Sequence, residues 1–296
     1  MDVSLFSPAK INLFLAVTGR RADGFHDLVS VVAPLDFGDQ LAATSKEPGA
    51  GRDYTLACNY PEVPVDGSNL VLKAAAAFVA ATGWKGAVHF HLGKRIPPGA
   101  GLGGGSSNAV AALRALNQLA GGLLDEAQLA GVAAKLGSDC ALFLAHAPIV
   151  MRGRGEQVEL LPARAAARLR GRRVLIFKPS FGISTPWAYQ RMIARGTDYV
   201  PAAEAEKKLA DWLQGDAPVE ALLANNMEPA VFGKYLALPV LLEKLRGEFG
   251  VVARMSGSGS ACYVLLGDDL VAAPLVARIR ECWGAGAFVQ EARLFW

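Results

Sequence analysis

The residues with the clearest chemical meaning lie in a glycine-rich loop between residues 97 and 108. Five of the seven residues from 99 to 105 are glycine, and Ser106 and Ser107 follow them directly. Apolar residues then recur at helical spacing, so a helix is expected to begin at the two serines, whose hydroxyls would cap its first N–H groups. Unobstructed backbone N–H groups at the positive end of a helix bind phosphate well. The sequence therefore predicts a phosphate-binding loop, and the alternative is a glycine-rich turn that serves packing alone.

The loop fits none of the three common nucleotide-binding patterns well. Its spacing Gly99-x-Gly101-x-x-Gly104 agrees with the dinucleotide fingerprint, but the acid expected further on, Asp125, opens a helix instead of ending a strand. A Walker A loop requires a lysine that this loop lacks. The triplet Asp36-Phe37-Gly38 is typical of protein kinases, yet it precedes the glycine loop and no His-Arg-Asp triplet is present. These three common nucleotide-binding folds are therefore disfavoured.

Regular elements are expected on both sides of the loop. Before it, Val88, Phe90 and Leu92 alternate with two histidines, which indicates a half-buried strand. After it, the first helix is expected to end at Gly121 and Gly122. Further elements are expected as a helix over 125–136, a strand pair over 150–161 turning at 153–155, a strand over 174–177, and then strand 251–255, strand 261–266, helix 269–282 and strand 287–294. That last order is typical of a split β-α-β layered unit, which places a domain boundary near residues 160–172.

Length and composition fit a globular protein of two domains or one large one. The chain has 296 residues, of which 52% are apolar and 19% charged, so it can bury a core and is not of the disordered class. No apolar run approaches the roughly 18 residues of a membrane span, and the N-terminus lacks the features of a secretory leader. We therefore expect a cytoplasmic location and no membrane partner. Four cysteines without paired spacing are expected to be buried thiols: Cys58, Cys140, Cys262 and Cys282.

Positive charge is concentrated in one short segment. The formal net charge is +3, and five arginines stand between residues 164 and 173. Because a nucleic-acid-binding protein spreads basic residues over a face or along a groove, this segment is interpreted as a solvated loop between strands, and no nucleic-acid partner is expected. His89 and His91 share one face of a strand without a third ligand nearby, which indicates a solvated face in place of a metal site.

Five segments in one order resemble the GHMP kinase superfamily. They are residues 7–15, 19–26, 99–109, 136–139 and 255–260. The resemblance implies an α+β, two-domain GHMP kinase fold, with an N-terminal ribosomal-protein-S5-like α/β domain that binds ATP over residues 1–162. A C-terminal ferredoxin-like GHMP kinase domain is expected over residues 163–296. The resemblance also implies a left-handed β-α-β crossover in the first domain, against the general rule.

Two of these segments narrow the expected activity. Pro8-Ala9-Lys10-Ile11-Asn12 and Asp23-Gly24-Phe25-His26 are similar to members that transfer the γ-phosphoryl group of ATP to the 2-hydroxyl of 4-diphosphocytidyl-2-C-methyl-D-erythritol. This reaction belongs to the non-mevalonate isoprenoid pathway. The resemblance therefore implies ATP and Mg²⁺ as cofactors and a small-molecule substrate that carries a cytidine diphosphate group, in a monomer or a homodimer.

The resemblance also assigns roles to individual residues. Asp139 is expected to accept the proton of the substrate hydroxyl and Lys10 to hold that hydroxyl; alternatively, Asp139 caps a short helix over 140–144 and Lys10 reaches solvent. ATP is expected to contact Asn69, Lys94, Pro97, Gly99, Gly101, Gly103, Gly104, Gly105, Ser106 and Ser107, with Ser106 also a candidate Mg²⁺ contact. The substrate is expected to contact Asn12, Phe25, His26, Thr185 and Gly257.

Two positions depart from the family pattern, and other functions stay open. Phe25 stands where tyrosine is usual, and Cys140 and Ala141 follow Asp139 where valine and proline are usual. One alternative is a GHMP kinase for another small alcohol, such as homoserine or a mevalonate derivative. A second is a non-catalytic nucleotide-binding homologue, and a third is a nucleic-acid binder whose affinity falls steeply with salt.

Overall fold

The computed structural model describes residues 1–47 and 53–296. These residues form two compact units. The first comprises residues 1–9, 37–98 and 103–146, and the second comprises residues 10–36, 99–102 and 147–296. Two long strands, β1 (Asp2–Arg20) and β2 (His26–Lys46), each contribute residues to both units. Among the described helices, none combines the length and apolar character that crossing a membrane requires.

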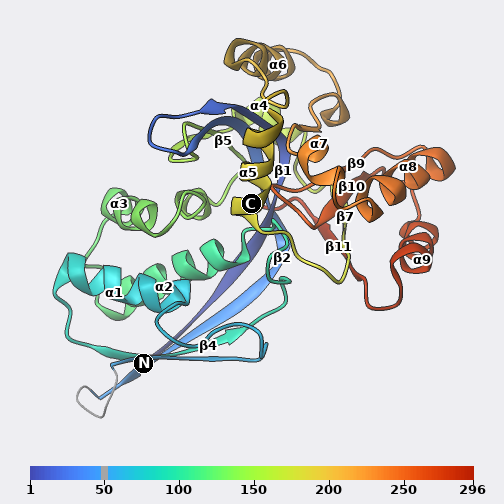
Figure 1. Cartoon of the computed structure of the whole chain (residues 1–296). Helices are drawn as coiled ribbons and strands as arrows, with labels where there is room; N and C mark the ends of the chain where they lie inside the picture. The colour runs from blue at the N-terminus through green and yellow to red at the C-terminus, as the bar shows by residue number, and fades with distance from the viewer. Residues whose placement is uncertain (48–52) are drawn as a thin grey trace. The chain divides into compact units, whose positions relative to one another are not determined.

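The first unit contains a parallel β-α-β arrangement. Strand β3 (Tyr54–Cys58) pairs in parallel with β4 (Ala87–Gly93), and helix α1 (Leu70–Thr82) connects them. Strand β4 also pairs antiparallel with the end of β2, where Gln40 lies opposite Gly93. Helix α1 packs against α2 (Gly104–Leu119) and α3 (Glu126–Leu136), as Figure 1 shows, and the short η1 (Ala141–Leu144) follows. The predicted strand before the glycine loop and the predicted helix ending at residue 136 are confirmed.

The second unit contains an antiparallel four-stranded sheet. Its strands are β7 (Arg173–Lys178), β9 (Ala253–Met255), β10 (Cys262–Leu266) and β11 (Phe288–Arg293). Their order in the sheet is β11-β7-β10-β9, and Cys262 of β10 lies opposite Phe177 of β7. Outside this sheet, the unit also contains β5 (Ile149–Arg152), β6 (Gln157–Leu160) and β8 (Ala224–Asn225). The helices are α4 (Ala163–Ala167), α5 (Thr185–Arg195), α6 (Ala202–Gln214), η2 (Val219–Ala221), α7 (Glu228–Phe232), α8 (Ala237–Phe249) and α9 (Ala272–Trp283). The predicted strand pair and the predicted order of the last four elements are confirmed.

The start of α2 differs from the prediction. Its N-cap is Gly103, with a φ of 72°, and no side chain caps the helix. Ser106 and Ser107 are therefore the third and fourth helical residues, and the prediction that their hydroxyls cap the helix is wrong. Glycine reaches this left-handed conformation without steric cost, so the chain turns into the helix earlier than the serines suggest. By contrast, Asp125 caps α3 through a capping box with Gln128.

The middle of β1 is buried along its whole length. Residues 9–17 are all buried, so both faces of the strand are covered by other parts of the protein. Most of these residues are apolar, but Lys10 and Asn12 are only 4% and 6% exposed. Buried polar side chains require hydrogen-bond partners, so these two positions mark a site with a purpose beyond packing.

The arginine-rich segment is not a solvated loop. It includes helix α4, and its side chains have partners in the second unit. Arg168 donates to three backbone carbonyl groups within residues 212–217 and lies 4.0 Å above the Trp212 ring. Arg172 and Arg173 pair with the carboxylates of Glu220 and Glu291. The prediction failed because the partners are distant in sequence, and the segment joins elements of the fold.

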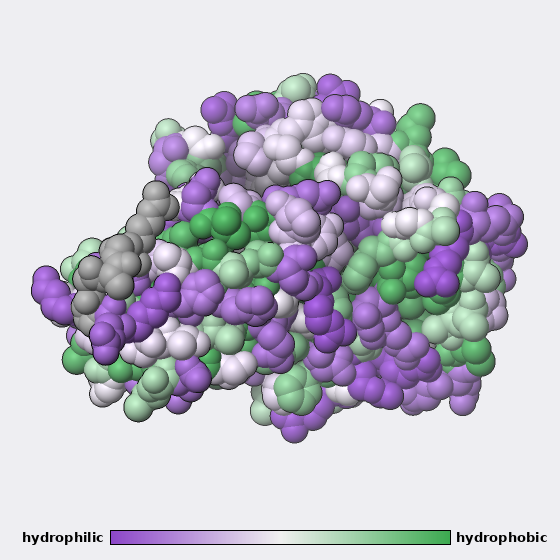
Figure 2. All heavy atoms as spheres, turned by 90° about the horizontal axis from the view of Figure 1, so that it is seen from below, coloured by the Kyte–Doolittle hydropathy of each residue, from purple (hydrophilic) through white to green (hydrophobic). Residues whose placement is uncertain are grey.

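The prediction that all four cysteines are buried is only half correct. Cys140 and Cys262 are buried, Cys58 is half-buried and Cys282 is exposed. Cys282 lies in the last turn of α9, beyond the buried Leu275 and Ile279. Composition alone does not distinguish the end of a helix from its packed middle. On the face seen in Figure 2, hydrophilic side chains surround smaller hydrophobic areas, as on most protein surfaces.

Candidate active site

In the first unit, the phosphate loop ends in three unpaired backbone donors. The Ser107 N–H donates to the Gly103 carbonyl at 2.9 Å, which is the first hydrogen bond of α2. The N–H groups of Gly104, Gly105 and Ser106 have no hydrogen-bond partner among the residues that the structure describes. Unpaired donors at a helix N-terminus, together with the positive end of the helix dipole, form an anion site. The arrangement therefore fits a phosphate group.

Lys94 lies against the start of α2. Its Nζ donates to the Asp39 carboxylate at 2.5 Å, and the Lys94 and Asp39 side chains are 6% and 0% exposed. A Cβ on Gly104 would lie only 2.8 Å from Lys94 Nζ, so the glycine leaves the space that the ammonium occupies. The predicted nucleotide contact Lys94 thus places a buried positive charge beside the three backbone donors.

Ser107 belongs to the same loop, but its hydroxyl lies in the interior. Ser107 is 1% exposed and accepts a hydrogen bond from the Ser7 hydroxyl at 2.8 Å. Ser106 is half-buried, so it is the serine of this loop that has access to a ligand. Of the two hydroxyls predicted to contact ATP, the geometry favours Ser106.

Cys140 holds the turn that contains Asp139 beside the phosphate loop. The Cys140 thiol is fully buried and hydrogen-bonds to the Ser106 side chain. Burial raises the pKa of this thiol to about 11; the Ser106 hydrogen bond opposes that rise, and the charge of Asp139 adds to it. The candidate base and Ser106 thus belong to the same part of the first unit. The alternative that Asp139 caps a short helix is not what the structure shows, because the N-cap of η1 is Cys140 and no side chain caps it.

In the second unit, β1 carries a buried polar chain. Lys10 Nζ donates to Asn12 Oδ1 at 2.7 Å, and Asn12 Nδ2 donates to Ser30 Oγ at 2.9 Å. The Ser30 hydroxyl in turn donates to the Phe14 carbonyl at 2.6 Å. Each member fixes the next, so the Lys10 ammonium has a defined position. Because Lys10 is buried, the alternative that its side chain reaches solvent is wrong.

Two small-residue loops meet beside this chain. The Ser256 hydroxyl donates to the Gly101 carbonyl at 3.0 Å, and Gly101 has a φ of +74°. A Cβ on Gly257 would lie 3.4 Å from Lys10 Nζ, 3.5 Å from Asn12 Oδ1 and 3.4 Å from the Gly101 carbonyl oxygen. The structure therefore brings together four of the residues predicted for catalysis, ATP and substrate.

His26 belongs to an aromatic cluster in the same unit, and Phe25 precedes it in the chain. The His26 ring stacks on Tyr189 with 4.6 Å between ring centroids, and its Nε2 lies 3.1 Å from the Tyr199 hydroxyl. Burial, and then the charge of nearby Arg20, lower the pKa of His26, which keeps the imidazole neutral near pH 7. Phe25 is 51% exposed, and the Arg154 guanidinium lies 4.6 Å from its ring centroid. Planar rings with one neutral polar edge suit the recognition of a nucleobase.

The remaining predicted residues have simpler surroundings. Asn69 caps α1 by accepting from the Val71 N–H at 2.9 Å, and its Nδ2 donates to the Pro64 carbonyl at 2.6 Å. Pro97 is half-buried, and Gly99 adopts a positive φ of +61°. In the second unit, the Thr185 hydroxyl lies 2.7 Å from that of Ser258. Each of these residues is placed by its local fold, and none of the contacts identifies a ligand.

Several residues of these clusters were not predicted. They are Asp39, Arg154, Tyr189, Tyr199 and Ser256. A signal for Asp39 is present in the sequence, because Phe37, Asp39 and Leu41 alternate along a strand and an acid at the middle position must face inward with its apolar neighbours. The other four offer no such signal, since their contacts depend on the packing of distant segments.

Comparison with known proteins shows the family to which the chain belongs. The sequence matches the family models described as GHMP kinases N terminal domain, at residues 69–147, and GHMP kinases C terminal, at residues 207–285. A protein of Methylacidiphilum infernorum named 4-diphosphocytidyl-2-C-methyl-D-erythritol kinase is 38% identical over 273 residues, covering 90% of this chain and 87% of that protein.

Solved structures support the same fold. A crystal structure of 4-(cytidine 5'-diphospho)-2C-methyl-D-erythritol kinase is 32% identical, with a TM-score of 0.75 over 98% of this chain and 99% of that chain. Homoserine kinase from Cytophaga hutchinsonii has a TM-score of 0.71 over 99% of this chain and 95% of that chain at 17% identity, which shows a common fold alone. The predicted two-domain α+β fold class is thereby confirmed.

Proposed function

The chain belongs to the 4-diphosphocytidyl-2-C-methyl-D-erythritol kinase family of the GHMP kinases, and from this premise we propose that it phosphorylates the 2-hydroxyl of that alcohol with ATP. The observation that carries the proposal is the placement of the Asp139 turn beside the unpaired donors of the phosphate loop, through the contact between Cys140 and Ser106. A general base next to a phosphate site is what phosphoryl transfer to an alcohol requires.

The proposed chemistry assigns one proton transfer to Asp139. The substrate hydroxyl oxygen attacks the γ-phosphorus of ATP, the bond from that phosphorus to the β-γ bridging oxygen breaks, and ADP leaves. The hydroxyl proton passes to the Asp139 carboxylate. Lys10 stabilises the negative charge that develops on the attacking oxygen, and Asn12 holds its ammonium in place at 2.7 Å.

The phosphate loop supplies the other part of the proposed catalysis. The N–H groups of Gly104, Gly105 and Ser106, with the ammonium of Lys94, bind phosphate oxygens and offset their charge as the phosphoryl group moves. Phosphoryl transfer involves little covalent chemistry by the protein, so positioning and charge stabilisation account for most of the acceleration.

Mg²⁺ is proposed as the metal ion that accompanies ATP. Groups of three or more metal-ligating side chains are absent from the described residues, which fits an ion held mainly by substrate phosphates. The Ser106 hydroxyl is a hard oxygen donor of the kind that Mg²⁺ prefers, so this chain would hold the ion through Ser106. When bound, the ion would neutralise phosphate charge.

Phe25 and the aromatic cluster around His26 are proposed to bind the cytidine group. Phe25 would stack on the cytosine ring, and the neutral His26 would hydrogen-bond to its edge. Phe25 lacks the hydroxyl of the usual tyrosine, so the base contact here relies on stacking.

The predicted boundary between residues 162 and 163, the cytoplasmic location and the monomeric or dimeric state remain predictions.

Release of ADP with a panel of alcohols tests the proposal. The panel contains 4-diphosphocytidyl-2-C-methyl-D-erythritol, homoserine, mevalonate and a methylerythritol without cytidine. We expect turnover with the first compound alone. Equal turnover of alcohols that lack cytidine would favour the broader small-alcohol kinase, and ATP binding without turnover of any alcohol would favour a non-catalytic homologue.

A further inference from the structure

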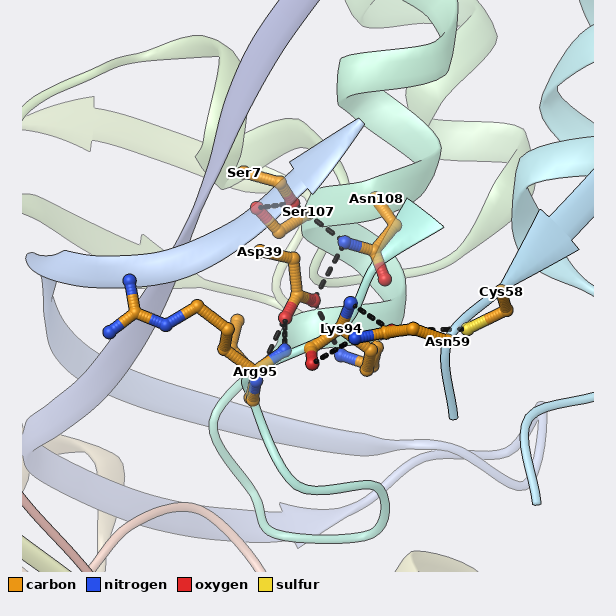
Figure 3. Close-up of polar contacts among 9 residues, drawn as sticks. Ser7, Asp39, Cys58, Asn59, Lys94, Arg95, Ser107 and Asn108 are labelled. Atoms are coloured by element: carbon orange, nitrogen blue, oxygen red, sulfur yellow. Dashed lines mark hydrogen bonds and ion pairs between the residues drawn. The ribbon is translucent and has the colours of Figure 1, made fainter. Parts of the chain in front are cut away.

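Asp39 is a fully buried carboxylate whose two oxygens contact different parts of the first unit. Oδ1 accepts hydrogen bonds from the backbone N–H groups of Arg95 and Ile96 at 2.7 and 2.8 Å. Oδ2 accepts from Lys94 Nζ at 2.5 Å and from Asn108 Nδ2 at 2.9 Å. Figure 3 shows the Lys94 and Asn108 side chains directed toward Asp39, whereas the Arg95 side chain points away from it; Asn108 also donates to the Ser7 hydroxyl. One carboxylate therefore joins β2, the segment after β4 and helix α2.

The charge arrangement around Lys94 needs an explanation. The positive end of the helix dipole repels an ammonium placed beside the helix N-terminus. An ammonium there therefore requires a nearby anion that compensates its charge. Within the described residues, Lys94 Nζ donates to Asp39, and an ammonium has three N–H groups to donate. Gly104, whose absent Cβ leaves space for Nζ, begins the run of unpaired backbone donors. The ammonium thus retains hydrogen-bonding capacity next to the anion site.

The backbone of Lys94 is held separately from its side chain. The Lys94 N–H donates to Asn59 Oδ1 at 2.6 Å, and Asn59 Nδ2 donates to the Lys94 carbonyl at 3.4 Å. Asp39 Oδ1 fixes the next two residues. A change confined to Oδ2 therefore releases the ammonium and Asn108 while these backbone contacts remain.

We propose that Asp39 is a positioning residue for ATP: it holds the Lys94 ammonium against the start of α2, so that Lys94 and the N–H groups of residues 104–106 contact the same phosphate chain. The inference rests on the proposed function, because it takes ATP as the ligand. Asp39 itself contacts no nucleotide; it acts through Lys94 and Asn108.

Three variants distinguish a role of Asp39 in positioning Lys94 from a role in the stability of the fold alone. Asp39→Asn keeps an oxygen for the two backbone donors but turns an amide NH₂ toward Lys94 and Asn108. Lys94→Met removes the ammonium and keeps the length of the side chain. The double variant Asp39→Asn/Lys94→Met removes both charges, so it recovers stability that Asp39→Asn loses by leaving a buried ammonium unpaired. Glu291→Gln, which removes the exposed ion pair with Arg173, is the control.

Two measurements are made on each full-length variant: the dissociation constant of MgATP by calorimetry without the alcohol substrate, and urea unfolding. We expect every variant at Asp39 or Lys94 to bind MgATP roughly 10- to 100-fold more weakly, the loss of a charge-assisted contact. The double variant is expected to unfold at higher urea than Asp39→Asn yet to bind MgATP no better. The control should bind like the wild type.

The outcomes distinguish this inference from the function on which it rests. If the wild type does not bind MgATP, the proposed function fails. If the wild type binds MgATP and the double variant binds within twofold of it, the positioning role is overturned while the proposed function stands. Tighter binding by Asp39→Asn would also overturn it, because Asp39 would then only reduce the positive charge of the site. The double variant keeps the test decisive if Asp39→Asn does not fold.

Discussion

The Lys10 ammonium and the Asn12 side-chain oxygen lie 2.7 Å apart on the same buried strand. An amide that orients a catalytic cation should affect turnover more than ATP binding. We predict that Asn12→Ala lowers kcat about 10-fold, the order expected for one hydrogen bond to a charged group, with little change in the KM for ATP. Steady-state kinetics at saturating alcohol measure this. Ser30→Ala removes the hydroxyl that accepts from Asn12 and donates to the Phe14 carbonyl but keeps Asn12 itself, so it should lower kcat less. An unchanged kcat in Asn12→Ala would contradict the role of Asn12.

Gly101 combines a positive φ of +74° with a close approach to another loop, since an added Cβ would lie 2.2 Å from the Ser256 carbonyl oxygen. Gly121 is a matched control, with a φ of +80° and nothing within 4 Å of an added Cβ. We expect Gly121→Ala to lower the free energy of unfolding by about 1 kcal/mol, the conformational cost alone. Gly101→Ala should cost clearly more. Equal losses in urea unfolding would show that the contact between the two loops does not matter.

His26 should make the KM for the cytidine-bearing substrate depend on pH. Its pKa lies below the ordinary 6.5, chiefly through burial and then through the charge of Arg20, so the bound imidazole is neutral at pH 7. Acidification protonates it, and we predict that the KM for the cytidine-bearing substrate rises only below the ordinary pKa. Arg20→Gln removes a charge that lowers the pKa, so the rise should begin at higher pH. His26→Asn should lack this rise, and a rise that persists in His26→Asn would assign it to another group.

The arginine-rich segment should contribute to stability and not to ligand binding. Arg168 donates to three carbonyl groups and stacks on Trp212, whereas Arg164 pairs with Asp216 through side chains that are 64% and 84% exposed. Arg168→Ala should therefore lower the free energy of unfolding by about 1 to 3 kcal/mol, and Arg164→Ala by less than about 1 kcal/mol. Both variants should keep kcat. Similar unfolding curves for the two would mean that the segment is solvated after all.

Local signals explain which parts of the fold could be predicted. The strand with Val88 and Phe90 and the helix capped by Asp125 depend on alternation and on neighbouring residues, and both are confirmed. The start of α2 was missed because Gly103 caps it by conformation and not by a hydroxyl. Polarity at Ser106 and Ser107 suggested a cap, although the glycine had already turned the chain.

Many residues of the site could be predicted from the sequence, but few of the contacts between them could. Family resemblance named Lys10, Asn12 and Gly257, which the structure places together. The pair of Asp39 and Lys94 joins residues 55 positions apart, and no local pattern specifies such a partner. Buried hydrogen bonds of this kind follow from how strands and helices pack, and a single sequence does not report that packing.

The proposed reaction can be followed as transfer of the γ-phosphoryl group from labelled ATP to 4-diphosphocytidyl-2-C-methyl-D-erythritol. The wild type should transfer the label to this alcohol. Asp139→Asn should bind MgATP as the wild type does but transfer the label roughly 10²- to 10⁴-fold more slowly, because the proton of the hydroxyl has no acceptor. Absence of transfer by the wild type would contradict the proposed function, and full transfer by Asp139→Asn would contradict the role of Asp139 as the proton acceptor.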